Sequence, residues 1–425
     1  MSADTSLVTP FVGERYADGA ALSRLIAPPY DVISQEARRR YAAADPHNIV
    51  HLILPEAAGD VNRYRSAAEH LAAWRAESVF RADPAPSVYV VAQTFSTPAG
   101  DRLTRVGMFA AVSAEPYETR RIRPHEKTHR GPKVDRLDLL RATHANLESI
   151  FLLAPDREGT LAGGLRAIAE GTRAPDASAD LDGVQIRLWV QSGPEADRLA
   201  AAAAAPLYIA DGHHRYETAV AYAGENPAAR RLLAFVVSAR DPGLVVLPTH
   251  RVVYAADRDV SALAGIWQRF FEVRPVPPPA DRVRLLEEAG RGRVACIVAT
   301  EGGQHDLLLT LRDDAPLDDI VELGRTPAVR GLDVAVVERL VVGEILGAGK
   351  STPTLTYTPD PAPALQVAHL GKALAAVLLN ATKVDQVFAV ADAGDVMPPK
   401  STYFIPKVPS GLVLRRADAA DRPTT

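Results

Sequence analysis

Residues 206–223 join a buried strand to a helix through a short polar turn. The apolar run 206–210 predicts the strand, and the alanine-rich run 219–223 predicts the body of the helix. Asp211 stands where a capping side chain accepts hydrogen bonds from first-turn amides, and Gly212 leaves the turn without a side chain. Amides at a helix start, with the positive end of the helix dipole, bind anions. The stretch therefore predicts an anion site, with an ordinary capped turn as the alternative.

The first turn of this helix carries further groups that can contact a phosphate. His213 and His214 supply imidazoles. Arg215 supplies a guanidinium and Thr218 a hydroxyl. Adjacent helix residues project about 100° apart, so the two histidines are not expected to hold one metal ion together. Asp211 is the candidate ligand for a Mg²⁺ ion that would accompany a phosphate, because hard cations prefer oxygen ligands.

A second polar stretch, residues 121–136, has no apolar periodicity over most of its length. Such a run is usually a solvated loop, yet its cations, two histidines and hydroxyl suit a loop that handles phosphate. Glu126, next to His125, is the candidate base for a hydroxyl acceptor, and Lys127 is a candidate phosphate contact. The alternative is a glutamate that only pairs with Lys127 or Arg130.

His125 and His129 also fit the letters of a zinc-binding His-Glu-x-x-His pattern. That pattern needs one continuous helix, so that both imidazoles share a face. Gly131 and Pro132 are expected to end such a helix almost at once, and the run has no apolar face to bury. Zinc is therefore kept as the minor alternative.

Lysine is scarce in this chain, with 7 lysines against 41 arginines. A compact ammonium differs from a planar guanidinium in what it can bind. In a third polar cluster, residues 397–407, Lys400 is a candidate phosphate contact, and an ordinary surface lysine is the alternative. Residues 347–352 end like a Gly-x-x-x-x-Gly-Lys-Ser phosphate loop, but position 344 is Glu and the loop follows a helix. We interpret that run as the C-terminal turn of the helix.

Two further positions are candidate substrate contacts. Pro28-Pro29 forces an extended backbone before Tyr30 and Asp31, which occupy a polar loop of the kind that forms ligand sites in α/β folds. Arg251 follows the end of a strand. Turn packing, a local cap and a capped strand end are the alternative interpretations.

Composition restricts the class of protein. The 425 residues suit two or three domains, and 47% hydrophobic with 24% charged residues fit a soluble globular chain. The net charge of −4 gives no basic field for nucleic acid, and no apolar run is long enough for a membrane span. No signal-peptide pattern opens the chain, and the single cysteine, Cys296, excludes an internal disulfide. We expect a cytoplasmic protein acting on a small molecule; its oligomeric state stays open.

Hydrophobic periodicity and turn residues predict the elements that must position these side chains. Besides the helix after Gly212, helices are expected at residues 34–43, 60–77, 137–143, 195–204, 263–271, 332–346 and 364–379. Strands are expected at residues 49–54, 88–95, 103–112, 149–153, 184–190, 232–238, 244–247, 294–299, 306–311 and 385–391, and a loop at 170–182.

These elements predict an α/β (α+β) protein with a mixed-sheet core, large insertions and extra C-terminal elements. The core, which would bind the nucleotide or phosphate, is expected over residues 1–258, with an insertion at about residues 55–200. A small α/β module is expected at 259–330. Residues 331–425 would return to the core, with a disordered tail at 415–425.

Four motifs, in this order, resemble the bacterial and archaeal family catalogued as domain of unknown function 1015. They are APPYDVIS at residues 27–34, PHE at 124–126, ADGHHRYET at 210–218 and MPPKSTYF at 397–404. The resemblance covers nearly the whole chain, from about residue 7 to 415. The family label implies no established chemistry.

A more distant resemblance does imply chemistry. Residues 211–215, DGHHR at a strand-to-helix turn, are similar to the signature of free-serine kinases of the ParB/sulfiredoxin-like superfamily. The resemblance implies a ParB/sulfiredoxin-like elbow in which Gly212, His213, His214 and Arg215 hold nucleotide phosphates. It also implies a glutamate that activates the serine hydroxyl. The assignment of Glu126 to that role rests on its neighbours, not on a matching motif.

These observations leave four hypotheses. The first is a small-molecule kinase that transfers phosphate from ATP or ADP, with Mg²⁺, to a hydroxyl such as that of free L-serine. The second is a phosphatase or other hydrolase at the same anion site, which bound zinc would favour. The third is a non-catalytic nucleotide-binding switch of ParB type, and the fourth a structural scaffold. The negative net charge gives a DNA-contacting switch no support.

Overall fold

The computed structural model describes residues 6–57, 61–255, 260–317, 320, 326–347 and 354–418. The chain divides into two compact units. The first unit combines residues 1–124, 128–245 and 406–425, and the second combines 125–127 with 246–405. The second unit thus includes the predicted module 259–330 and most of the predicted returning segment. Residues 348–352 of the Gly-Lys-Ser run and 419–425 of the predicted tail lie outside the described ranges.

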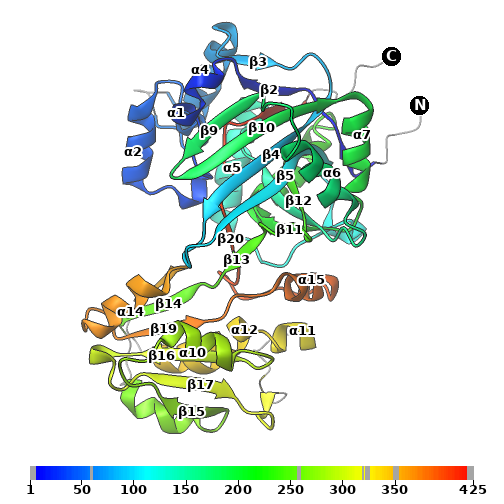
Figure 1. The fold of residues 1–425 in the computed structure, drawn as a ribbon. Coiled ribbons are helices and arrows are strands. Elements are labelled where there is room, and N and C mark those ends of the chain that lie inside the picture. Colours follow the sequence, from blue (N-terminus) through cyan, green and yellow to red (C-terminus); the bar gives the residue numbers. More distant parts are fainter. Residues whose placement is uncertain are drawn as a thin grey trace. The chain divides into compact units, whose positions relative to one another are not determined.

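Within the described residues, a nine-stranded sheet forms the centre of the first unit (Figure 1). Two neighbouring pairs in it are parallel and the others antiparallel, so the predicted mixed sheet of an α/β protein is confirmed. Its order is β6 (Ile122–Arg123), β11 (Leu207–Asp211), β8 (Ile150–Ala154), β12 (Arg231–Ser238), β5 (Arg102–Ser113), β4 (Ser87–Ser96), β10 (Val184–Ser192) and β9 (Ala177–Leu181), with β1 (Val8–Thr9) on β5.

The helices of the first unit, in chain order, are α1 (Leu22–Leu25), α2 (Gln35–Ala44), α3 (Val50–Ile53), α4 (Arg63–Ala76), α5 (Arg130–Thr143), α6 (Thr160–Ala169), α7 (Gly193–Ala202) and α8 (His213–Glu225). α6 and α7 pack against β4 and β10, α8 packs against β8 and β12, and α5 packs on α8. Alternate strand residues such as Val90, Met108 and Val236 join Leu161 and Leu199 in one buried cluster, as the two-residue period of a strand requires.

A smaller antiparallel sheet returns the end of the chain to the first unit. Its order is β3 (Phe80–Ala82), β2 (Gly13–Tyr16), β21 (Leu414–Arg416) and β7 (Ala145–Asn146). Because β21 lies between β2 and β7, residues after 405 are built into the same unit as the N-terminal strands.

An antiparallel six-stranded sheet forms the second unit. Successive residues point to opposite faces, so Val253 and Val377 join one buried cluster while Val252 and Ala376 join another. Its order is β15 (Phe271–Pro275), β17 (Leu307–Leu311), β16 (Ala295–Ala299), β19 (Ala375–Leu379), β14 (His250–Ala255) and β18 (Thr354–Thr358). β13 (Val245–Leu247) and β20 (Tyr403–Ile405) form a two-stranded sheet.

The helices of the second unit are short. They are α9 (Ala264–Trp267), α10 (Arg282–Ala289), α11 (Pro327–Arg330), α12 (Asp333–Val337), a π-helical turn at Glu338–Val342, α13 (Gly343–Leu346), α14 (Pro361–His369) and α15 (Val384–Asp392). Across the part of the chain that the structure describes, no helix combines the length and apolar character of a membrane span.

Several predicted elements are wrong, mostly in short apolar runs. Residues 49–54 contain helix α3, residues 364–379 combine the end of α14 with the buried strand β19, and residues 385–391 lie in α15. The predicted loop at 170–182 contains β9. Apolar runs of this length do not distinguish a strand from a buried helix. α5 begins at Arg130, seven residues before the predicted start at 137, since a proline in the first turn gives up an amide that has no helical partner.

Candidate functional site

The predicted strand-to-helix elbow is formed by β11, Gly212 and α8. Gly212 is the N-cap of α8, with φ 90° and ψ 28°. A Cβ at this position would lie 3.2 Å from the Arg215 guanidinium carbon and 3.2 Å from the Ile150 Cα. The left-handed backbone and the close packing both favour glycine, so this one residue sets the geometry of the turn.

Asp211 does not cap α8, and that prediction is wrong. Asp211 is the last residue of β11, and its carboxylate turns to two cations. Oδ2 accepts a hydrogen bond from Arg215 at 2.8 Å, and Oδ1 accepts one from Lys407 Nζ at 3.1 Å. Burial by itself raises the pKa of Asp211, but Lys407 and Arg215 outweigh it and lower the pKa to about 2. The carboxylate is therefore ionised throughout the physiological range.

The first turn of α8 keeps backbone donors without an acceptor. The Tyr216 amide donates to the Gly212 carbonyl at 2.9 Å, which closes the turn. Among the described residues, nothing accepts from the amides of His214 and Arg215. These amides lie at the positive end of the helix dipole. They follow Asp211 in the chain by a few residues, and the Asp211 carboxylate pairs with Lys407. The arrangement fits a bound anion.

The two histidines of the elbow have different surroundings. His213 is buried, whereas His214 is half-buried. The His129 amide donates to His214 Nε2 at 2.8 Å, and the two rings stack with centroids 6.1 Å apart. Burial and the nearby His129 lower the pKa of His214. His214 is therefore neutral at pH 7, with its ring proton on Nδ1.

Two side chains farther along α8 support this turn. Glu217 accepts hydrogen bonds from Thr128 Oγ1 at 2.7 Å and from Lys133 Nζ at 2.9 Å. Thr218 is buried, and its hydroxyl donates to the His214 carbonyl at 2.7 Å. The Thr218 hydroxyl thus serves the helix itself, and a phosphate contact for it stays a prediction.

The loop with Tyr30 and Asp31 is fixed by a buried glutamate that the sequence analysis missed. Glu148 Oε1 accepts from the Tyr30 amide at 2.9 Å and from Ser410 Oγ at 3.3 Å. The Arg136 guanidinium lies 4.1 Å from the Tyr30 ring centroid and 3.4 Å from the other Glu148 oxygen. Burial raises the pKa of Glu148, against the effect of Arg215 and Arg136. Asp31 itself is exposed.

A cavity of about 50 Å³ connects these two parts of the site. Arg136, Glu148, Arg215 and Thr218 are among its lining residues. It has room for a few water molecules but not for a nucleotide base. We interpret it as part of the support beneath the elbow.

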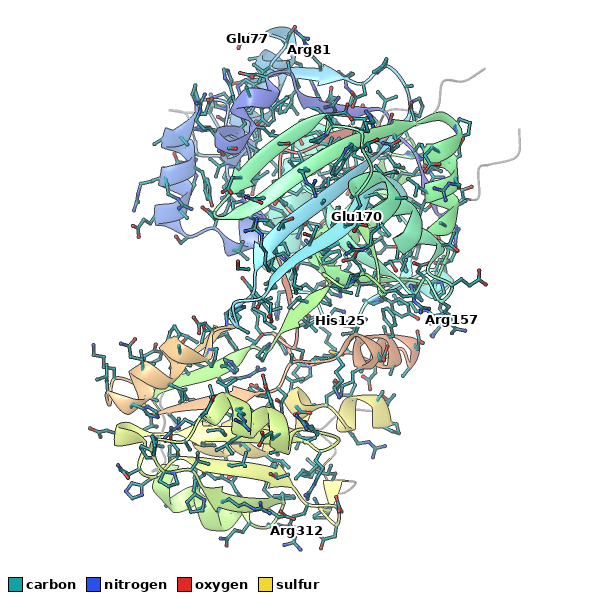
Figure 2. The ribbon with its side chains drawn as sticks, viewed as in Figure 1. Glu77, Arg81, His125, Arg157, Glu170 and Arg312 are labelled. Carbon is teal, nitrogen blue, oxygen red and sulfur yellow. The ribbon has the colours of Figure 1, made fainter. Side chains whose placement is uncertain are left out.

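Glu126 and its neighbours belong to the second unit, where they meet the third polar cluster. The Met397 amide donates to the His125 carbonyl at 2.8 Å, and Glu126 forms a parallel bridge with Met397. His125, labelled in Figure 2, is 1% exposed, and its Nε2 lies 3.2 Å from Thr402 Oγ1. The structure thus brings His125 and Glu126 of the PHE motif together with the MPPKSTYF motif in the second unit. Lys127 and Lys400 are exposed.

The zinc interpretation of His125 and His129 lacks the helix that it needs. Residue 126 forms a bridge, and α5 begins only at Arg130. The two histidines also fall in different units. Over the described ranges, no group of three or more His, Cys, Asp or Glu side chains could hold a metal ion. Mg²⁺ needs less from the protein, because it keeps several waters and uses one or two carboxylates with substrate phosphates. The ionised Asp211 fits that requirement.

Arg251 is 1% exposed and is held inside the second unit. Its Nε donates to Glu338 at 2.9 Å, and its Nη1 donates to the Thr249 carbonyl. Arg251 Nη2 and the Thr249 hydroxyl are buried without a hydrogen-bond partner among the described residues. Burial lowers the pKa of the adjacent His250 to about 4. A substrate contact by Arg251 stays a prediction.

The candidate residues therefore fall into two groups. In the first unit lie Tyr30, Asp31, Asp211, Gly212, His213, His214, Arg215 and Thr218; in the second lie His125, Glu126, Lys127, Arg251 and Lys400. Lys407, Glu148 and Arg136 also contact the site, and none of them was among the residues predicted for it. Lys407 had a signal, since it is one of only 7 lysines. The sequence signal for Glu148 was weaker, since it is a single acidic residue beside a buried strand.

Three solved structures can be compared with this chain. A free serine kinase in complex with AMP is 13% identical, with a TM-score of 0.38 over 70% of this chain and 87% of that chain. A conserved hypothetical protein from Pyrococcus furiosus is 13% identical, with a TM-score of 0.36 over 71% and 93%. SbnI with a C-terminal truncation, from Staphylococcus aureus, is 10% identical, with a TM-score of 0.38 over 73% and 88%.

A search of curated proteins finds no match. A family model does match, over residues 8–335, and its description reads "Protein of unknown function (DUF1015)". The match covers well over half of the chain and includes three of the four motifs, those at residues 27–34, 124–126 and 210–218. The resemblance drawn from those motifs is confirmed, and this chain belongs to the DUF1015 family.

Proposed function

We propose that this protein is a small-molecule kinase that transfers a phosphoryl group from ATP or ADP to a hydroxyl, with free L-serine as the acceptor. The observation that carries the proposal is the start of α8. There the amides of His214 and Arg215 have no acceptor among the described residues, beside the ionised Asp211 and its two cations. The DGHHR signature supports the nucleotide, since it resembles that of free-serine kinases.

In this proposal each group at the elbow has a role. Gly212 lets the nucleotide phosphates approach the backbone, and the amides of His214 and Arg215 donate to them. His214 adds a neutral ring donor, and buried His213 keeps the turn packed. Asp211 would hold Mg²⁺, which neutralises charge on the transferred group. The Tyr30–Asp31 loop, fixed by Glu148, would contact the substrate.

The kinase proposal also needs a base for the acceptor hydroxyl, and Glu126 is the proposed one. Glu126 takes the proton of the acceptor hydroxyl as the new O–P bond forms, and buried His125 positions Glu126 through the strand pairing with Met397. Lys127 and Lys400 are exposed cations that would meet the charge of the transferred group. Arg251 would be a substrate contact.

Phosphorus NMR of the purified protein with Mg²⁺, L-serine and either ATP or ADP tests the proposal. A new phosphomonoester signal that requires serine is expected. Glu126→Gln should slow its appearance by roughly 10²–10⁴-fold, the usual worth of a general base, without weakening ADP binding. His214→Ala should weaken ADP binding itself. Glu118→Gln, an exposed glutamate in the first unit, is the matched control and should behave like the unchanged protein.

Other outcomes would point to the other hypotheses. Free phosphate released without any acceptor would identify a hydrolase. Tight nucleotide binding with no turnover for any hydroxyl would favour a nucleotide-binding switch. If the nucleotide signals neither broaden nor change, the elbow does not bind nucleotide and the proposal fails.

A further inference from the structure

Two arginines lie directly opposite each other in the smaller sheet of the first unit. Arg15 on β2 pairs with Arg81 on β3 in antiparallel register. Directly opposed residues share one face of a sheet, with their Cβ atoms about 4.5–5.5 Å apart. The next pair, Tyr16 and Phe80, lies on the other face, with ring centroids 4.4 Å apart. Like charges in such a pair repel each other, so another charge is needed to offset the repulsion.

The two guanidinium groups differ in their partners. Arg15 donates to both oxygens of Asp83, from Nε at 2.9 Å and from Nη2 at 2.7 Å. Such a bidentate pair is the strong form of an arginine–carboxylate contact. For Arg81, labelled in Figure 2, the described residues supply neither an ion pair nor a hydrogen-bond acceptor for the guanidinium. Arg81 therefore keeps its side-chain donors for water or a ligand.

Both arginines line a cavity of about 280 Å³, together with the carboxylates of Asp83 and Asp176. Asp176 is held from outside the cavity, because its Oδ2 accepts from Arg173 Nη2 at 2.7 Å and from the Val190 amide at 2.7 Å. With Arg173 included, three guanidinium groups face two carboxylates, which leaves one positive charge, on Arg81. The cavity therefore suits a ligand with a single negative charge.

Apolar side chains line the same cavity. Leu22 of α1, Leu188 of β10 and Leu412 are all buried. The volume lies slightly below the range of about 300–1,000 Å³ that is usual for ligand pockets, so the ligand is a small molecule. One free guanidinium beside buried leucines fits a carboxylate on a short hydrocarbon chain. A phosphate monoester carries about two negative charges at pH 7 and would exceed the single positive charge of the cavity.

We propose that this cavity binds a small monocarboxylate with an apolar body. The Arg81 guanidinium holds the carboxylate through two parallel hydrogen bonds, and the leucines contact the hydrocarbon part. The bound anion also offsets the repulsion between Arg81 and Arg15. β9, whose Ala177 lines the cavity, and β11 of the elbow lie towards opposite ends of the nine-stranded sheet. The site is therefore separate from the elbow, and the inference does not depend on the kinase proposal.

Calorimetric titration of the full chain with sodium hexanoate tests this inference. Arg81→Gln should weaken hexanoate binding at least about tenfold, the worth of one hydrogen bond to a charged group. Arg81→Lys keeps the charge but loses the planar fork, so its affinity should fall between the two. Arg39→Gln is the matched control, because Arg39 is another exposed arginine of the first unit and does not line the cavity. Arg81→Gln also removes the charge opposite Arg15, so its unfolding temperature without ligand should be no lower than that of the control.

Further probes test the two parts of the ligand separately. Acetate, butyrate and hexanoate share the charge and differ in length, so affinity should rise about fourfold for each CH₂ that the leucines cover. 1-Hexanol has no charge and should bind the unchanged protein and Arg81→Gln equally.

The inference fails if hexanoate gives no binding heat with the unchanged protein, or if Arg81→Gln binds hexanoate as tightly as Arg39→Gln does. It also fails if acetate or inorganic phosphate binds as tightly as hexanoate, because the leucines would then contribute nothing. None of these probes is a nucleotide, so each of these results leaves the kinase proposal as it stands.

Discussion

Two helices of the first unit, α6 and α8, follow similar short sequences, but their first-turn amides differ in whether they have an acceptor. α6 follows Gly159 and α8 follows Gly212, and both glycines have a left-handed backbone, with φ 75° and 90°. Each helix also has an aspartate upstream. At α6, Asp156 accepts from the amides of Leu161 at 3.1 Å and Ala162 at 2.9 Å. A side chain of the preceding loop therefore already accepts the first-turn amides of α6. Arg157 of that loop is labelled in Figure 2.

At α8 the aspartate is adjacent to the glycine, and its carboxylate goes elsewhere. Asp211 still belongs to strand β11, so its side chain follows the strand and meets Arg215 and Lys407. Asp156 lies three residues before its glycine, which gives the loop enough length to fold back onto the helix. The difference teaches that an Asp–Gly step before a helix does not guarantee a cap. The number of residues between the aspartate and the glycine decides whether the aspartate accepts the first-turn amides or leaves them for a ligand.

The largest expected difference between the two helix starts is in stability. Asp211→Ala leaves two partly buried cations without their shared carboxylate, and we expect a loss of about 3 kcal/mol in the free energy of unfolding. Asp156→Ala removes a cap and should cost about 1–2 kcal/mol. Urea denaturation of both variants measures this difference. Equal losses would mean that the Asp211 network is only another cap.

The next largest expected effect is the dependence of the free energy of unfolding on pH. The folded-state pKa of Asp211, about 2, lies below its ordinary value of 3.8. The ionised carboxylate therefore contributes stability that is complete above pH 3.8 and is lost as the pH falls through 2. A difference of roughly two units corresponds to about 2.5 kcal/mol. Denaturation curves between pH 4.5 and 2.5 should show this loss in the unchanged protein but not in Asp211→Asn. Identical slopes would contradict the assignment.

The smallest expected effect is on the affinity for ADP. Gly212→Ala places a Cβ against Arg215 and Ile150, so ADP affinity should fall about tenfold, or about 1.4 kcal/mol. Gly159→Ala imposes similar backbone strain, about 1–2 kcal/mol, but its Cβ would lie 3.9 Å from the nearest atoms. ADP titration of the two folded variants tests whether only one helix start binds an anion. A matching loss in Gly159→Ala would assign the effect to stability alone.

Local patterns in the sequence determined the strand, glycine and helix of the elbow, the β4–β5 hairpin and the Ser34 cap of α2, which accepts from the Ala37 amide at 3.1 Å. Each depends on residues only a few positions apart, where side-chain period and turn chemistry act directly. The same patterns predicted the wrong structure for residues 364–391. A continuous apolar run buries itself equally well as a strand or a helix, and only its neighbours choose between them.

The partners of the site were decided by the tertiary structure. Lys407 and Asp211 are 196 residues apart, and Glu148 and Tyr30 are 118 apart. No distance between them follows from residue types and spacing, so the sequence pattern points Asp211 to the nearest donors in the chain, the amides of its own helix. Once the chain returns to the first unit after residue 405, Lys407 joins Arg215 beside that carboxylate, and two cations attract it more strongly than a neutral amide does. The sequence by itself determined that an elbow with open donors could form, and the return of the chain added the second cation that holds Asp211.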